Sequence, residues 1–182
     1  MKPAITSSLA VAVAVLALAA TALAGTVTAT TTVTGAGAIT LSHGATSSLS
    51  STLDGSDQNV TYTVPLTLID ARGTGAGWNV TLTSTTFTTG VKSLATTASS
   101  ITGITATCNG GGTCTSPTNA ISYPLTVPAA ATAPAAVKIF NAASATGLGR
   151  FTVTPTVSVT IPGNSFSGTY TSTLTVAAVS GP

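Results

Sequence analysis

The sequence predicts an all-β fold, an antiparallel β-sandwich with the two-sheet architecture of immunoglobulin-like domains. Apolar residues alternate with Thr and Ser over several long stretches, glycine- and proline-rich breaks separate these stretches, and no amphipathic helical pattern follows the N-terminal segment. Alternation with period two is typical of half-buried antiparallel strands. Threonine suits the outer face because its branched Cβ fits a pleated backbone while its hydroxyl meets water. The number and spacing of the stretches predict two packed sheets.

The expected strands can be placed in order along the chain. The clearest alternation marks strands at 60–68, 78–82, 151–161 and 170–178. Shorter strands are expected at 26–34, 38–42, 48–53, 104–107 and 121–127. Pro65 and Pro155 fall inside strand patterns, where a missing backbone N–H is tolerated mainly at edges or bulges. The Ala- and Pro-rich stretch 127–136 is expected to form an extended loop, because prolines interrupt it and it has no apolar stripe.

The N-terminus indicates the compartment. Lys2 precedes an uninterrupted apolar run at 9–20, and Ala22-Leu23-Ala24 is a small-x-small cleavage site before Gly25. This pattern is typical of a secretory signal peptide, predicted at 1–24. The apolar run is shorter than the roughly 18 residues of a spanning helix, so no membrane span is expected after cleavage. Residues 25–182 are long enough for a single domain with one core, which we expect to be secreted and to reside at the extracellular cell surface.

The chain has very few charged side chains. They make up 4% of the residues, with no glutamate, whereas ordinary soluble domains have about 25%. Nucleic acid is excluded as a partner because phosphate binding needs clustered Lys and Arg, and here four cations are scattered over 25–182. A nearly neutral surface of hydroxyls and amides has little repulsion to keep molecules apart. This predicts association with a cell wall, with a partner protein or with other copies.

The residues suited to catalysis or metal binding are scarce. His43 is the single histidine and lies in an expected turn, and no Gly-x-Ser-x-Gly motif marks a nucleophile, although a Ser-His-Asp triad can recruit distant residues. Asp54 and Asp57 share a segment that is more typical of a polar turn than of a calcium loop, since the bidentate acidic residue and the EF-hand spacing are missing. We therefore predict no catalytic residue, no metal site and no cofactor.

Two cysteines and two glycine-rich segments have structural interpretations. Cys108 and Cys114 are close together in a secreted chain and are predicted to form a disulfide. The alternative is a metal site, for which two thiolates would need two further ligands, and the chain has a single histidine. Closing a ring of about seven residues stabilises by roughly 2.4 kcal/mol in the loop-entropy description. The glycines at 73–77 and 147–149 lead into strands rather than helices, so they are predicted to be turns that aim Trp78 and Phe151, not phosphate loops.

Several segments together resemble a known family. They are 70–82, which contains Trp78-Asn79-Val80; Lys138-Ile-Phe140-Asn-Ala; Gly147-Leu-Gly149-Arg-Phe151; and 168–182, which contains Val176-Ala177-Ala178. They resemble the signature of the WxL-type surface domain, in which Trp-x-Leu occurs twice; in this chain the second copy has no aromatic residue. The resemblance implies a β-rich module that attaches non-covalently to Gram-positive cell walls. It suggests binding residues at the matching positions: Trp78, Val80, Tyr170, Leu174 and Val176.

Trp78 has two possible roles, a core anchor or a platform on which glycan rings stack. The primary functional prediction is a non-catalytic cell-surface protein that associates non-covalently with cell-wall polymer (peptidoglycan) or with other surface proteins. The alternative is a structural subunit of an extracellular filament or surface layer, assembled by β-strand addition. It is motivated by residues 26–34, an uncharged alternating segment that could complete the sheet of a neighbouring copy.

Overall fold

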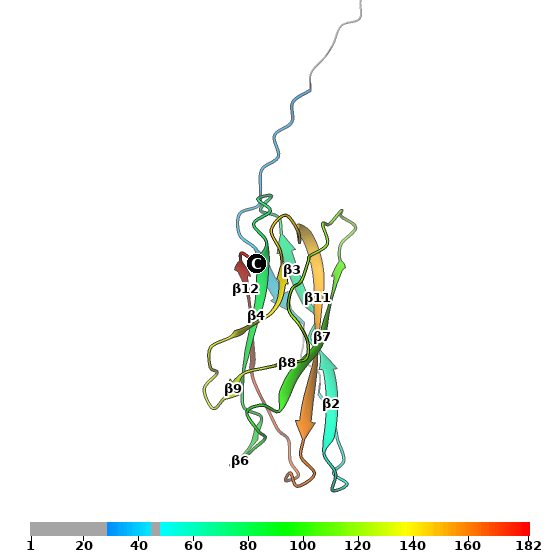
Figure 1. Ribbon diagram of the computed structural model, residues 1–182, viewed down its shortest axis with the longest axis vertical. Coiled ribbons are helices and arrows are strands. Elements are labelled where there is room, and N and C mark those ends of the chain that lie inside the picture. The colour runs from blue at the N-terminus through cyan, green and yellow to red at the C-terminus, as the bar shows by residue number, and fades with distance from the viewer. Residues whose placement is uncertain (1–28, 45–47) are drawn as a thin grey trace, which may run out of the picture. The chain divides into compact units, whose positions relative to one another are not determined.

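The computed structural model describes residues 29–44 and 48–182 (Figure 1). The chain divides into two units, Met1–Thr32 and Val33–Pro182, and the fold given below is that of the second. The predicted signal peptide at 1–24 lies outside the described residues. Over the described ranges there is no helix long and apolar enough to cross a membrane.

Two main sheets and a short two-stranded sheet, β5-β6, make up the second unit. Sheet A has the strand order β1-β3-β11-β7-β8, and β2 also pairs with β11. Sheet B has the order β10-β4-β12, and β9 adds to β4. The strands are β1 (Thr40–His43), β2 (Gln58–Thr63), β3 (Leu66–Asp70), β4 (Trp78–Thr85), β5 (Thr88–Thr89), β6 (Lys92–Ser93), β7 (Ser99–Cys108), β8 (Leu125–Thr126), β9 (Ala129–Ala130), β10 (Val137–Ala142), β11 (Gly149–Ile161) and β12 (Leu174–Ser180). The predicted all-β antiparallel sandwich is confirmed; the β4–β9 contact is parallel.

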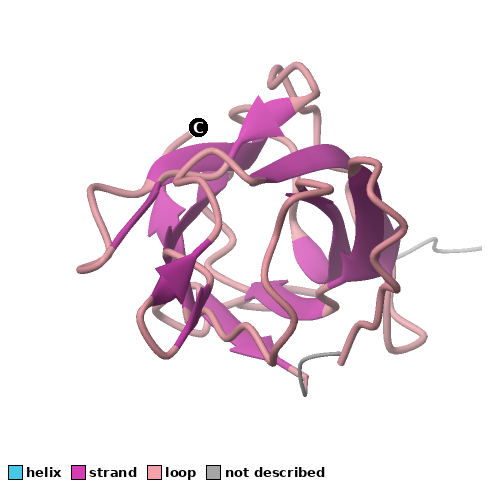
Figure 2. Ribbon diagram, turned by 90° about the horizontal axis from the view of Figure 1, so that it is seen from below, coloured by secondary structure: helices cyan, strands magenta, loops and turns pink. Residues whose placement is uncertain are grey.

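The core lies between the sheets, which Figure 2 shows end-on. β11 contributes its apolar positions to the core, with Phe151, Val153 and Val157 no more than 1% exposed. Leu66 and Leu68 of β3 join them from sheet A, while Val80 and Leu82 of β4 face them from sheet B. The alternation seen in the sequence is therefore the alternation between core and outer face along each strand.

The two prolines of the strand patterns lie where a missing backbone N–H removes no hydrogen bond between paired strands. Pro65 falls in the break between β2 and β3, which together line one edge of β11. Pro155 is inside β11, and its carbonyl accepts a hydrogen bond of 3.0 Å from the Val64 N–H. Since N–H and C=O of one residue point to the same side of a strand, the absent donor of Pro155 faces this break. The expected 60–68 strand is thus interrupted at 64–65.

Other expected strands also differ in the structure, and the one expected at 170–178 begins only at Leu174, as β12. Residues 48–53 form no strand, because Ser51 and Thr52 are tied to β2 through the Gln58 side chain rather than a backbone ladder. Residues 29–34, the described part of the expected 26–34 strand, are exposed and have no strand partner in the described chain. The strand expected at 121–127 is reduced to β8. In contrast, β10 was not predicted, because a register shift between Lys138 and Phe140 places consecutive apolar residues in the core.

Candidate functional site

The segments that carry the family resemblance converge on β4. β12 pairs with β4 so that Val176 lies opposite Leu82 and Ala178 opposite Val80. On the other side of β4, β10 places Phe140 opposite Val80 and Ala142 opposite Trp78. The two halves of the motif, far apart in the sequence, are therefore adjacent antiparallel strands of sheet B.

Trp78 is the centre of this arrangement. Its side chain has 0% exposure, and its indole Nε1–H donates a hydrogen bond of 2.8 Å to the carbonyl of Gly147. Its ring lies 5.8 Å from that of Phe140 and 6.3 Å from that of Phe151, between centroids, which is the range of favourable aromatic pairs. A Cβ on Gly147 would lie 2.5 Å from Trp78 Nε1, so glycine is required for the close approach. In this structure Trp78 is a core anchor, and its ring offers no face on which a sugar could stack.

A buried ion pair secures the glycine-rich turn that leads to Trp78. Arg72 donates from Nε to Asp70 Oδ1 and from Nη2 to Oδ2, each at 2.8 Å, and its Nη2 also donates to the Gly77 carbonyl. Its Nη1 hydrogen-bonds to Ser180 Oγ of β12. The hydrogen bonds from Arg72 lower the pKa of Asp70, against the opposing effect of burial. One guanidinium therefore joins the end of β3, the turn and the end of β12.

The other predicted binding residues face mostly inward. Val80 has 0% exposure, whereas Tyr170, Leu174 and Val176 are half-buried and pack against the core. The Tyr170 hydroxyl donates to the Phe166 carbonyl at 3.0 Å. For Trp78 and Val80, direct contact with a ligand does not fit their burial; a binding role for Tyr170, Leu174 and Val176 stays a prediction.

The residues considered for catalysis and metal binding lie apart. His43 is exposed at the end of β1 beside the Gly44 carbonyl. Asp54 accepts hydrogen bonds from the Ser56 hydroxyl and N–H, which lower its pKa to about 2, and Asp57 accepts from the Gly163 N–H. Within the described ranges, no group of three or more His, Cys, Asp or Glu side chains could hold a metal ion. Cys108 and Cys114 form the predicted disulfide, with a Cα–Cα distance of 5.9 Å.

The outer face of sheet A presents rows of hydroxyl groups, which we call the hydroxyl face. The outward positions of β11 alternate with the buried ones, and the strand register sets them beside outward Thr and Ser of neighbouring strands. The paired residues are Thr152 with Thr67 and Thr107, Thr154 with Thr105, Thr156 with Thr63, and Ser158 with Thr61 and Ser100. None of these residues is charged. The sequence predicted a hydroxyl side for each strand, but the rows could not be placed without the strand order and register.

Fold and site define a β-sandwich domain whose family-specific segments lie around one buried tryptophan. The family model of the WxL domain, described as a surface cell wall-binding domain, matches residues 26–177. The chain belongs to this family, and the resemblance seen in the sequence is confirmed. No curated protein and no solved structure matches the chain significantly.

Proposed function

We propose that this protein is a secreted, non-catalytic surface protein that binds cell-wall polymer non-covalently. The observation that carries the proposal is the match to a cell wall-binding family over residues 26–177, which spans nearly the whole sandwich. The scarcity of charged side chains also supports it, because the protein has few groups for electrostatic binding and many for neutral hydrogen bonding.

The hydroxyl face is the surface that best fits a glycan. Each Thr or Ser hydroxyl offers one donor and two acceptor sites, which match the hydroxyl and amide groups of sugars. Thr105, Thr154 and Thr156 lie close together on β7 and β11, and no side-chain hydrogen bond within the described residues occupies their hydroxyls. Their methyl groups add apolar contact area between the hydroxyls.

The motif residues act on binding indirectly in this proposal. Trp78 anchors β4, β4 holds β10 and β12, and the core that these strands share with β11 supports the hydroxyl face from beneath. Val176, at the position of the missing second Trp, is half-buried, so the departure from the family motif affects packing more than ligand contact.

A wall pull-down tests the proposal. The triple variant T105V/T154V/T156V removes three hydroxyls but retains branched, strand-forming side chains. Since each net hydrogen bond contributes about 0.5 to 1.5 kcal/mol, its affinity for purified wall should fall about tenfold or more. The double variant T173V/T175V, at exposed positions before and within β12, is the matched control and should bind normally.

The salt dependence of wall binding is a second test of the proposal. Binding through neutral groups should change little between low and high salt, because few ion pairs are present to be screened. Unchanged binding by the triple variant would exclude the hydroxyl face. If the folded wild-type protein binds no wall at any salt concentration, the wall-binding proposal itself is wrong.

A further inference from the structure

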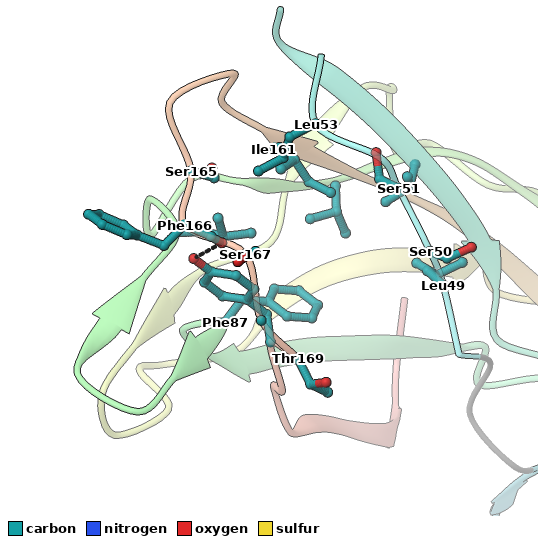
Figure 3. A pocket seen from close by; sticks show the side chains of 15 residues that line it. Leu49, Ser50, Ser51, Leu53, Phe87, Ile161, Ser165, Phe166, Ser167 and Thr169 are labelled. Atoms are coloured by element: carbon teal, nitrogen blue, oxygen red, sulfur yellow. Dashed lines mark hydrogen bonds between the residues drawn. The ribbon is translucent and has the colours of Figure 1, made fainter. Parts of the chain in front are cut away.

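An apolar groove lies at the end of the sandwich far from Asp70 and Arg72. Its volume is about 430 Å³, within the usual range for ligand sites, and no charged residue lines it. Figure 3 shows Leu53 and Ile161 on one side of the groove and Phe87 on the other, with Leu49 on the segment that crosses beside it. The groove therefore suits a neutral and largely apolar occupant.

The walls of the groove favour an extended peptide over a compact ligand. Residues 48–53 and 164–169, which flank it, belong to no strand. The backbone groups of 48–53 take part in no backbone–backbone hydrogen bond in the described chain. The Gln58 side chain donates a hydrogen bond to the carbonyl of Thr52. β2, next to this segment, pairs along one edge with β11 and has no ladder on its other edge within the described residues. Free backbone groups beside an apolar groove are the features that strand addition uses.

The chain itself contains a segment with matching chemistry. Residues 26–34 are uncharged, and Val27, Ala29 and Val33 share one face of an extended chain because side chains alternate. Val33 is 90% exposed, and its neighbours at 29–34 are exposed as well. A valine that is 90% exposed in an alternating segment has apolar surface to bury, and within the described residues little covers it.

Distance excludes insertion of Val33 into the groove of its own chain. Ala36 donates to the Ala71 carbonyl, and Gly35 lies against the backbone of Arg72, so the segment joins the sandwich beside Asp70, which is opposite Gly149 at the start of β11. The groove is lined by Ile161 at the other end of β11. A strand of 13 residues is about 40 Å long at the usual rise, whereas two residues reach about 7 Å beyond Gly35.

We propose that the groove binds segment 26–34 of a second copy of this chain. The segment joins the sandwich at Gly35 and Ala36, at the end of β11 opposite the groove. Each copy therefore offers one segment and one groove, and the contact is heterologous. Head-to-tail contacts of this kind extend into chains of molecules unless their rotation closes a ring. This self-association goes beyond wall binding and uses a different surface from the hydroxyl face.

The test uses mature protein (25–182) and measures mass by light scattering over a wide concentration range, with electron microscopy of the largest species. Wild-type protein should form species that grow with concentration. V33D should remain monomeric, since a charge on the segment would enter an apolar groove. V91D is the matched control because Val91 is 97% exposed but does not line the groove, and this variant should associate like the wild type.

A mixture of two variants tests the head-to-tail arrangement. L53D places the charge in the groove and leaves the segment intact, while V33D leaves the groove intact. Each alone should be monomeric, and a mixture should yield dimers of one copy of each. A thermal melt checks that L53D is folded. V33D is expected to fold normally because Val33 is 90% exposed. Monomeric wild-type protein at every concentration, or V33D that associates normally, would overturn the proposal.

Discussion

The two ends of the sandwich are built in different ways. At the Trp78 end, a buried indole hydrogen bond, the Asp70–Arg72 ion pair and the Cys108–Cys114 disulfide all lie near the starts of β4 and β11. At the groove end, two irregular segments flank an apolar groove, and Leu49, Leu53 and Phe166 are at least 36% exposed. The first end has its polar groups paired internally, whereas the second leaves backbone groups and apolar side chains available to another molecule.

This difference predicts that substitutions at the two ends affect different properties of the protein, its stability and its self-association. Substitutions at the Trp78 end should change the free energy of unfolding, because they disrupt buried and paired groups. Substitutions at the groove end should change mainly self-association. The family motif lies at the Trp78 end, so we expect its tryptophan to contribute to the stability of the fold rather than to association.

The largest effect is expected for W78A. Truncating a buried tryptophan costs about 3 to 5 kcal/mol, and here the Gly147 carbonyl would also lose its donor. Chemical denaturation followed by circular dichroism should show a large loss of stability or an unfolded chain. F166A, at a 59% exposed aromatic residue of the groove end, is the control and should unfold like the wild type. A W78A protein of normal stability would contradict the core-anchor role.

Breaking the ion pair should come next. D70A leaves the guanidinium of Arg72 without its carboxylate in a mostly buried site, and such losses cost about 3 kcal/mol. In the wild type the folded state holds the pKa of Asp70 below its unfolded value, so the ion pair stabilises fully above about pH 4 and the contribution is lost as pH falls further. Between pH 7 and pH 3, the free energy of unfolding should therefore fall by more for the wild type than for D70A. Denaturation curves recorded at several pH values in this range measure it. Equal slopes would mean that Asp70 is not the titrating group.

Filling the space at Gly147 should have an intermediate effect. G147A puts a methyl group 2.5 Å from Trp78 Nε1 at a residue with φ of 72°, so both overpacking and backbone strain oppose it, at about 1 to 3 kcal/mol or more. G37A separates the two causes, because Gly37 has φ of 90° with open space around it. The loss of stability for G147A should exceed that for G37A; equal losses would remove the packing argument.

Removing the disulfide should cost less than removing the tryptophan. C108S/C114S is expected to lose about 2 kcal/mol, because the ring is small, and to remain β-rich with a lower Tm. The core that defines the fold lies elsewhere. A chain that no longer folds without the bond would show that the disulfide creates the fold rather than stabilising it.

The smallest effect on stability is expected when residues 25–34 are deleted. The described part of this segment is exposed and has no strand partner, so the Tm should change by no more than its experimental error. Self-association should be lost in the same protein. A large drop in Tm would indicate that the segment is a strand of its own sandwich, as the alternation alone first suggested.

The long strands could be predicted from the sequence because their residues alternate between apolar core positions and polar outer positions. β11 follows the expected 151–161 closely, since every second residue from Phe151 to Val159 is in the core. The sequence-based prediction was wrong for 48–53 and 29–34, where side chains alternate but no neighbouring strand in the described chain pairs with the segment. It missed β10, where a register shift interrupts the alternation. Pairing is a tertiary property, so local pattern alone could not separate used from unused strand segments.

The site was harder to predict for the same reason. The sequence identified Trp78 as special and offered both roles for it, but only the contacts with Gly147, Phe140 and Phe151 decide between them. The groove was not foreseen, because its lining comes from segments that are far apart in the chain and two of them are irregular. The hydroxyl face required the register across four strands.

The order of strands in the sheets also determines when the molecule can fold during its synthesis. β11 is the strand to which β2, β3 and β7 all pair, and it comes after each of them in the chain. β4, likewise, waits for β10 and β12. Until residue 161 has emerged, sheet A lacks its central strand, and only the β1–β3 and β7–β8 pairs of this sheet can form. Such late, non-local pairing is slow, so sheet A is expected to be completed only near the end of synthesis.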